Sequence, residues 1–272
     1  MRPEVITEFF DPPRPRAIAH RGASGDYPEN TLNAFTAARD AGAPYIELDV
    51  HLTRDGSVVV AHDDDLARVG NSSGLISEMT LTEVAQVDAG YNFTPASSIG
   101  REFPFRGRGI RVPALQEVFA ACPAQRFIVE IKQSSPSLIE PLIAVIDRAA
   151  MRRRVLVACE HQAPIDEFRR AAPDIPTNFP TEEVAAFLMS MPPGAPQFIP
   201  RGEALQIPPE HLGWKMVTPE IVAEAHRMGL ELHVWTVNEE AEMRSLLALG
   251  VDGIITDFPA RLLKLLASRP AL

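Results

Sequence analysis

Short apolar runs alternate with helical patterns along most of the chain, from Ala17 onward. The apolar runs predict strands at 17–20, 45–50, 57–62, 126–131, 155–159, 175–179, 204–208, 232–236 and 253–256. Helical patterns predict helices at 30–41, 113–121, 136–150, 163–171, 181–190, 218–228, 239–249 and 259–267. Repeated strand–helix units are typical of a parallel sheet covered by helices. At 272 residues the chain has the length of one α/β barrel, so we expect a single domain over 1–272.

Nine apolar runs compete for the eight strand positions of such a barrel, so one run is short, extra or misread. The runs 45–50 and 57–62 are joined by HLTRDG, which is too short for a helical crossover. We therefore expect these two strands to form a local hairpin. The Pro-rich residues 1–16 carry no periodicity and are expected to form an arm that leads to the first strand.

Residues 63–112 break the regular alternation. This segment contains Gly and Ser residues and one short helical pattern, LTEVAQVD at 81–88. Fifty residues (63 to 112) at one loop position are unusual for a linker, whereas lids and small caps over a site have this character. We predict a cap insertion at 63–112.

Residue types at several helix ends support the assignments. Asn30 is expected to cap the helix at 30–41, and Gly42 follows its end. Pro219 falls in the first turn of the helix at 218–228, and Gly229 closes that helix.

Composition excludes several classes of protein. The chain has 26 Lys and Arg against 36 Asp and Glu, a net charge of −10, which argues against nucleic-acid binding because phosphates would be repelled. Cys122 and Cys159 have no metal or redox spacing and are expected to be reduced thiols in the core. No signal peptide or transmembrane run is present, so a cytoplasmic location is expected.

Polar side chains at the ends of successive predicted strands are the candidate chemistry. His20 ends the first strand, and Glu47 and Asp49 lie on one face of the second because side chains alternate along a strand. Taken alone, His20 is more often a hydrogen-bonded core histidine, and the acidic pair an exposed polar face. In an all-parallel barrel, however, both faces are buried, so a carboxylate pair inside needs a cation or a shared proton.

His62 ends the third apolar run, and Glu130 and Lys132 share one face at the end of the fourth. Separately, a turn and a structural ion pair explain these residues. Together, four strand ends place such groups on one rim, and active sites of (β/α)8 barrels form at the carboxyl ends of the strands. One site explains the four features better than four independent accidents.

Five segments resemble the glycerophosphodiester phosphodiesterase family in order and spacing. They are AHRGASGDYPENTLNAF, IELDVHLTRDGSVVVAHDDDLAR, VEIK, HVWTVN and DGIITDFPARL, and together they span nearly the whole chain. The resemblance implies a TIM-type (β/α)8 barrel with a small cap inserted after the second histidine. The chain departs from the family pattern at RVGNSSG (68–74), where many relatives are Thr-rich, which concerns substrate detail at the cap entrance.

The resemblance also implies roles for individual residues. Glu47, Asp49 and Glu130 match the ligands of one divalent cation, and three carboxylates without a cysteine suit Mg²⁺ or Ca²⁺. The paired acid–base histidines of the family match His20 and His62. Its phosphate-contacting cations match Arg21 and Lys132.

Trp235 and Asp257, near the rim, each have two possible roles. Trp235 either lines the site as a wall for the glycerol or alkyl portion of the substrate, as the resemblance favours, or packs in the core. Asp257 either orients a site residue or caps the final helix, and capping is the expected role.

Aromatic and arginine residues alternate in the predicted cap. Phe93, Phe103 and Phe105 are expected to pack within the cap, and the alternative is a lid in which these rings contact an acyl chain.

The predicted activity is metal-dependent hydrolysis of glycerophosphodiesters to an alcohol and glycerol 3-phosphate. Attack is either by water directly or by a neighbouring substrate hydroxyl, which would form a cyclic phosphate. A lysophospholipase D that uses the same site on lysophospholipids is the first alternative, and the Phe-rich cap favours it. A catalytically silent binding barrel is the second alternative, and the complete set of site residues disfavours it.

Overall fold

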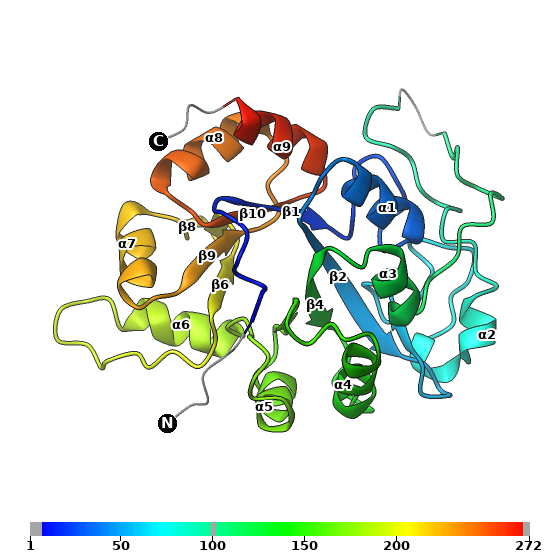
Figure 1. Cartoon of the computed structure of the whole chain (residues 1–272), viewed down its shortest axis with the longest axis horizontal. Helices are drawn as coiled ribbons and strands as arrows, with labels where there is room; N and C mark the ends of the chain where they lie inside the picture. Colours follow the sequence, from blue (N-terminus) through cyan, green and yellow to red (C-terminus); the bar gives the residue numbers. More distant parts are fainter. Residues whose placement is uncertain (1–6, 99–101, 269–272) are drawn as a thin grey trace.

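The computed structural model describes residues 7–98 and 102–268, and seven parallel strands form the wall of a barrel. The strand order is β5-β4-β2-β1-β10-β9-β6, and each neighbouring pair runs parallel (Figure 1). The strands span β1 (Arg16–His20), β2 (Tyr45–Leu52), β4 (Arg126–Ile131), β5 (Val155–Ala158), β6 (Ala204–Ile207), β9 (Glu231–Val234) and β10 (Gly253–Thr256). The expected TIM-type α/β barrel is confirmed.

The eighth position is filled by two residues rather than by a full strand. Thr177 pairs in parallel with Val157 of β5, and Asn178 pairs in parallel with Ala204 of β6. The predicted strand at 175–179 is therefore the short one, and its bridges close the sheet on itself. The extra run is β3 (Val58–Val60), which pairs antiparallel with β2 outside the barrel path, so the predicted hairpin is confirmed.

Helices cover the outside of the barrel (Figure 1). They are α1 (Leu32–Asp40), α3 (Leu115–Ala121), α4 (Ile139–Arg148), α5 (Gln162–Ala171), α6 (Thr181–Met189), α7 (Pro219–Arg227), α8 (Glu240–Leu249) and α9 (Pro259–Ala267). Each matches a predicted helix. Within residues 7–98 and 102–268, no helix has the length and apolarity needed to cross a membrane.

The cap of α1 differs from the prediction. Thr31, not Asn30, is the N-cap, and its side chain accepts a hydrogen bond from the backbone N–H of Ala34. Asn30 has a left-handed backbone (φ 56°), and its side chain donates to Asp49 instead. The predictions for Pro219, which opens α7, and for Gly42, with φ 91° after α1, are confirmed.

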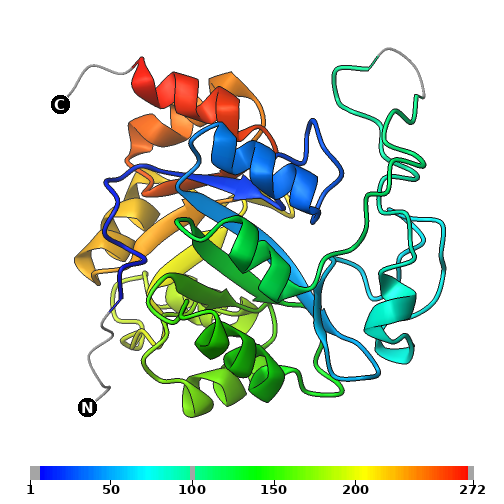
Figure 2. The same cartoon turned by 45° about the vertical axis from the view of Figure 1, so that its right-hand side comes forward.

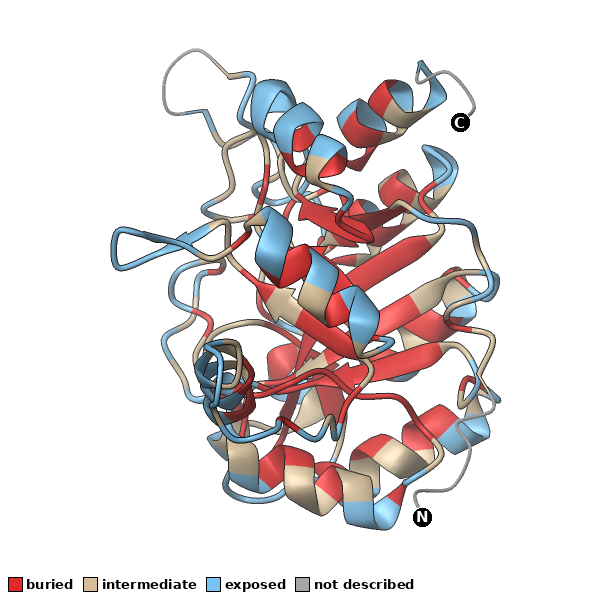
Figure 3. Cartoon of the chain, turned by 90° about the vertical axis from the view of Figure 1, so that its left-hand side faces the viewer, coloured by how far each residue is buried: buried red, intermediate tan, exposed pale blue. Residues whose placement is uncertain are grey.

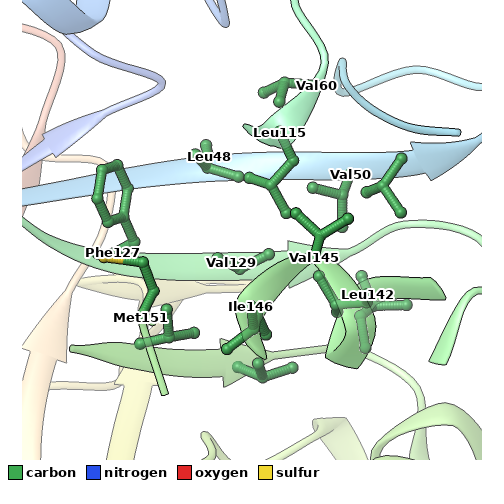
Figure 4. Close-up of a cluster of buried hydrophobic side chains, with 14 of the residues drawn as sticks. Leu48, Val50, Val60, Leu115, Phe127, Val129, Leu142, Val145, Ile146 and Met151 are labelled. Carbon is green, nitrogen blue, oxygen red and sulfur yellow. The ribbon is translucent and has the colours of Figure 1, made fainter. Parts of the chain in front are cut away.

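Alternation along the strands separates an outer core from the barrel interior. Leu48 and Val50 of β2 face outward with Val129 of β4, and they pack against the outer helices (Figure 4). The residues between them, Glu47 and Asp49, therefore face the interior of the barrel. Both faces of β2 are buried, as expected for a parallel barrel.

The N-terminal arm closes the floor of the barrel. Phe9 is fully buried and packs with Tyr45 and Ile18 from the strands, and Tyr45 donates a hydrogen bond to the carbonyl of Phe9 at 2.6 Å. Arg16 forms a two-pronged ion pair with Glu231 beside them. With the floor filled, the open end of the interior lies at the carboxyl ends of the strands.

The described residues of segment 63–112 leave the barrel after β3 and stand to one side of it (Figure 2), and residues 99–101 of the predicted cap lie outside the described residues. It contains a 3-10 turn, η1 (Ile76–Glu78), and the short helix α2 (Leu81–Val84). Its buried side chains, including Leu66, Ile76 and Val84, form a small core with Val59 of β3.

Candidate active site

One cavity of about 420 Å³ opens where the strands end. It is lined by His20, Arg21, Glu47, His62, Glu130, Lys132 and Trp235, together with apolar residues from the later strands. Of the predicted site residues, only Asp49 is absent from this lining, because its side chain lies behind the others and is 1% exposed. The fold thus brings residues from positions 20 to 235 into one site.

Glu47, Asp49 and Glu130 form an acidic triad. One oxygen from each lies within 4.8 Å of the others. Glu47 and Asp49 converge because they are two residues apart on β2, and Asp49 is in register with Glu130 on the neighbouring β4. The triad is therefore a direct consequence of strand alternation and register.

The negative charge of the triad is only partly compensated by Arg21 and Lys132. Burial, and then the charge of Asp49, raise the pKa of Glu47 to about 8. The same two causes raise the pKa of Glu130. Buried carboxylates that repel one another in this way favour a proton or a cation between them.

A hard cation fits this triad. Asp49 Oδ1 is buried and accepts no hydrogen bond from the described residues, although Lys132 Nζ lies 3.4 Å away. All three donors are carboxylates, which are the ligands that Mg²⁺ and Ca²⁺ prefer. The triad could therefore bind a divalent cation.

His20 is held by Asp257 across the β1–β10 pair. Its Nδ1 lies 2.6 Å from Asp257 Oδ1, and its Nε2 lies 4.0 Å from Glu47 Oε2. Burial disfavours the charged ring, but the hydrogen bond with Asp257 and the charge of Glu47 outweigh it and raise the pKa of His20. Because Asp257 engages Nδ1, the other ring nitrogen is free to face a ligand.

His62 has the same arrangement at the end of the β2–β3 hairpin. It follows β3, and its Nδ1 lies 2.7 Å from Oδ1 of Asp63. Arg68 donates to the second oxygen of Asp63 at 2.6 Å. Two histidines thus line the cavity, each with a carboxylate at Nδ1.

Arg21 is held by a left-handed turn after β1. Arg21 and Gly22 have φ of 54° and 85°, and a side chain at Gly22 would lie 2.6 Å from the backbone of Ala34. The turn lets the Arg21 backbone N–H donate to Glu47 at 3.0 Å, while its guanidinium pairs with Glu29 at 2.9 Å. Glycine is therefore required at position 22 on two counts.

Lys132 and Trp235 complete the polar and apolar sides of the cavity. Lys132 Nζ donates to Glu130 at 2.7 Å. Trp235 follows β9, lines the cavity and is 43% exposed, so it is a wall residue and not a core residue. Phe179, Val184, Ile207 and Met216 extend this apolar wall.

The aromatic residues of segment 63–112 do not contribute to that wall. Phe93 packs on Phe105 with ring centroids 5.5 Å apart, and Phe105 packs on Tyr27 at 5.8 Å. The guanidinium of Arg106 stacks on Phe103. None of these residues lines the cavity, so the expectation that the rings pack among themselves fits and the acyl-contact alternative does not.

Comparison with known proteins gives the same assignment as the motifs. Residues 20–261 match the family model described as the glycerophosphoryl diester phosphodiesterase family. The chain belongs to this family. It is 34% identical over 255 residues to a glycerophosphodiester phosphodiesterase of Caldanaerobacter subterraneus subsp. tengcongensis, covering 91% of this chain and 96% of the relative.

Two further relatives of this phosphodiesterase bear on fold and substrate. The crystal structure of a glycerophosphoryl diester phosphodiesterase family protein from Silicibacter pomeroyi superposes with a TM-score of 0.76 and 31% identity, covering 94% of both chains. A lysophospholipase D of Rattus norvegicus is 27% identical and covers 94% of this chain and 87% of the relative.

Sequence reasoning gave Asp257 a role in orienting a site residue only as the alternative, and it missed the other residues that hold the phosphodiesterase site in place. The expected capping role of Asp257 is wrong: the N-cap of α9 is Phe258, which makes no side-chain cap, and Asp257 instead bonds His20 and accepts from Asn238 at 2.6 Å. Asn30 was similarly assigned to a cap but donates to Asp49 at 2.9 Å. In the sequence, the position of Asp63 directly after His62 indicated that a carboxylate could contact this histidine.

The departure at 68–74 lies in segment 63–112 and not in the phosphodiesterase cavity. Asn71 accepts a hydrogen bond from the backbone N–H of Asp88 at 3.0 Å, which stabilises the segment internally. Arg68, at its start, donates to both oxygens of Glu29.

Proposed function

We propose that the protein hydrolyses glycerophosphodiesters to an alcohol and glycerol 3-phosphate in a reaction that depends on a divalent cation. The observation that carries the proposal is a single cavity with an acidic triad, two carboxylate-held histidines and two cationic side chains. A phosphodiester is anionic and gains negative charge on attack, so this combination matches the charge of its transition state.

Glu47, Asp49 and Glu130 would hold the cation, Mg²⁺ or Ca²⁺. When bound, the cation would supply Lewis-acid stabilisation of charge on the phosphoryl oxygens. The unbonded oxygen of Asp49 and the raised pKa of Glu47 support this assignment, because both reflect missing positive charge.

His20 and His62 are proposed to transfer protons. One takes a proton from the attacking hydroxyl, either of water or of the substrate, and the other protonates the leaving alkoxide. Asp257 and Asp63 each engage Nδ1, so Nε2 is the nitrogen presented for transfer in both rings. The carboxylates also fix the ring orientation, as they do in other histidine–carboxylate pairs.

Arg21 and Lys132 are proposed to bind the phosphate. Both cations contact the triad, Arg21 Nε at 3.2 Å from Asp49 and Lys132 Nζ at 2.7 Å from Glu130. They are thus positioned to share their charge with a phosphate bound next to the triad. We further propose that segment 63–112 is the cap of this site, since Arg68 reaches both Glu29 and Asp63.

A lysophospholipase D activity is the second candidate. The wall formed by Phe179, Ile207, Met216 and Trp235 favours it, because an acyl chain gains free energy from apolar burial. The likeness to a lysophospholipase D of Rattus norvegicus supports the same reading. A silent binding barrel is the third reading, and it predicts no turnover with any substrate.

A substrate panel separates these readings. Glycerophosphocholine, glycerophosphoinositol and lysophosphatidylcholine are incubated with Mg²⁺ or Ca²⁺, and the phosphate-containing product is identified. Glycerol 3-phosphate from the first two substrates supports the main proposal, and lysophosphatidic acid from the third supports the second candidate. Absence of turnover with all three would contradict both.

A further inference from the structure

An exposed hairpin borders the candidate cavity. It consists of β7 (Glu210–His211) and β8 (Trp214–Lys215), and it extends away from the barrel on the side opposite the N-terminus (Figure 3). Met216 at its base and His211, which pairs with Trp214 next to the turn, line the cavity. Leu212 and Trp214, near its tip, are 86% and 77% exposed.

The tip carries a residue that the turn itself does not favour. Leu212 and Gly213 have φ of 50° and 80°, the pattern of a type I′ turn. That turn prefers Asn or Asp at its first position, because a bulky side chain is strained at positive φ. Leu212 gains no burial in return. Stability of the folded chain therefore does not explain an apolar residue at this position.

We propose that Leu212 and Trp214 dock onto a zwitterionic lipid surface and bring the cavity to lipid substrates. This inference rests on the proposed function, in its lysophospholipid form. Leucine and tryptophan are side chains that insert at lipid–water interfaces. The hairpin continues from the apolar wall of the cavity, so an acyl chain that leaves the surface would pass directly from the tip to the wall.

The charge of the protein indicates which lipid headgroups the hairpin would contact. The whole chain carries a net charge of −10, so an anionic surface would repel it. The hairpin itself contains one acidic and one basic residue, Glu210 and Lys215, which balance. A phosphatidylcholine surface, with no net charge, is therefore the expected occupant, in preference to a phosphatidylglycerol surface.

Sedimentation with vesicles tests the docking. The full chain, Leu212→Asn and Trp214→Ser are mixed with phosphatidylcholine vesicles that contain lysophosphatidylcholine, and with phosphatidylglycerol vesicles. We expect the unmodified chain to bind the first kind more tightly, and each substitution to weaken that binding by about tenfold, the effect of withdrawing one large apolar side chain. Leu212→Asn improves the turn, so its thermal stability should not fall.

A matched control replaces Ile199, which is 75% exposed but does not line the cavity, by Asn. It should bind vesicles like the unmodified chain. Hydrolysis of glycerophosphocholine, a small soluble substrate, should be unchanged in all three variants. If the unmodified chain hydrolyses neither substrate but still binds vesicles through the tip, the proposed function fails while the docking stands.

Three results would overturn the docking proposal. The first is no vesicle binding by the unmodified chain. The second is binding that survives both tip substitutions. The third is a dimer, detected by light scattering without lipid, that Trp214→Ser disrupts, because the tip would then contact a second copy of the chain.

Discussion

Asp257 Oδ1 lies 2.6 Å from Nδ1 of His20, and the second oxygen of the same carboxylate accepts a hydrogen bond from Asn238 at 2.6 Å. Ser24 donates to Oδ1 at 2.9 Å. The carboxylate is thus fixed from three directions. Its pKa is lowered, because the contacts with His20 and Asn238 outweigh its burial. An ionised Asp257 therefore faces the imidazole.

Asp257→Asn should lower kcat by roughly 10²-fold or more, because the amide no longer holds the imidazole in one tautomer. It should also shift the pH–rate limb of His20 to lower pH, since the Asp257 contact helps to raise the pKa of that ring. Asp252→Asn is the matched control, because Asp252 pairs with His226 away from the cavity. An unchanged pH profile in Asp257→Asn would show that this carboxylate has only a structural role.

Removal of the cation should abolish turnover. Chelation would withdraw the cation that is proposed to balance the triad, and added Mg²⁺ or Ca²⁺ should restore activity. Glu47→Gln should weaken cation binding, measured by calorimetry, by at least about tenfold. Glu78→Gln, on the 3-10 turn of segment 63–112, is the control and should bind the cation normally. Full turnover after exhaustive chelation would remove the cation from the reaction.

His20→Ala and His62→Ala should each lower kcat by about 10²–10⁴-fold, the scale of general acid–base catalysis. Their side chains are 18% and 31% exposed at the rim, so unfolding midpoints should change little. The same substitution at His226, which is partly exposed away from the cavity, should leave kcat unchanged. A variant that unfolds but stays fully active in its folded fraction would identify that histidine as a core residue.

Glu231 should make stability depend on acid pH. Burial opposes its charge, but hydrogen bonds from Arg16 and His233 outweigh burial and lower its pKa to about 2. The unfolded-state pKa is near 4.3. Its contribution is therefore complete above that unfolded-state value and is lost as the pH falls toward 2.

The check is urea unfolding of the unmodified chain and of Glu231→Gln between pH 6 and pH 3. The stability difference should be largest at pH 6 and shrink with acidity. Glu224→Gln is the control, because its partner Arg227 is exposed and surface pairs contribute little. A difference that stays constant with pH would assign the effect to packing rather than to charge.

Arg68→Met should raise KM by roughly tenfold with little change in stability. Arg68 fixes Glu29, which in turn pairs with Arg21, so its loss should misplace the guanidinium that is proposed to bind the phosphate. Arg54→Met removes a comparable exposed pair with Glu83 and should leave KM unchanged. Because this network includes Arg21, the residue proposed to bind the phosphate, replacement of 63–112 by a short linker should impair small and lipid substrates alike. Selective loss of the lipid substrate would contradict that coupling.

The sequence predicted those features that depend on local pattern. Alternation along β2 placed Glu47 and Asp49 on one face, and the short connection to β3 predicted the hairpin that ends at His62. The metal, acid–base and phosphate-binding roles came from the family resemblance and stay predictions. All the residues to which it gives those roles meet at one cavity or directly behind it.

Long-range partners could not be predicted in the same way. His20 and Asp257 are 237 residues apart and meet only because the barrel closes β1 against β10. The pairing of the first strand with the last is set by closure of the whole sheet, and no local sequence pattern indicates it. Asn30 shows a second difficulty: its residue type fits a helix cap equally well, and only the left-handed backbone turns it toward Asp49.

β2 also fixes the relative positions of the acidic triad and His62. It carries two of the proposed cation ligands, its Asp49 carbonyl accepts from the Ala61 backbone at 3.1 Å, and His51 Nε2 contacts the His62 carbonyl at 3.1 Å. The spacing between His62 and the triad is therefore set by one pleated strand and not by the outer helices. Changes in the sequence or tilt of those helices can therefore leave that spacing intact. A one-residue insertion in β2, by contrast, would turn Asp49 outward and abolish the site.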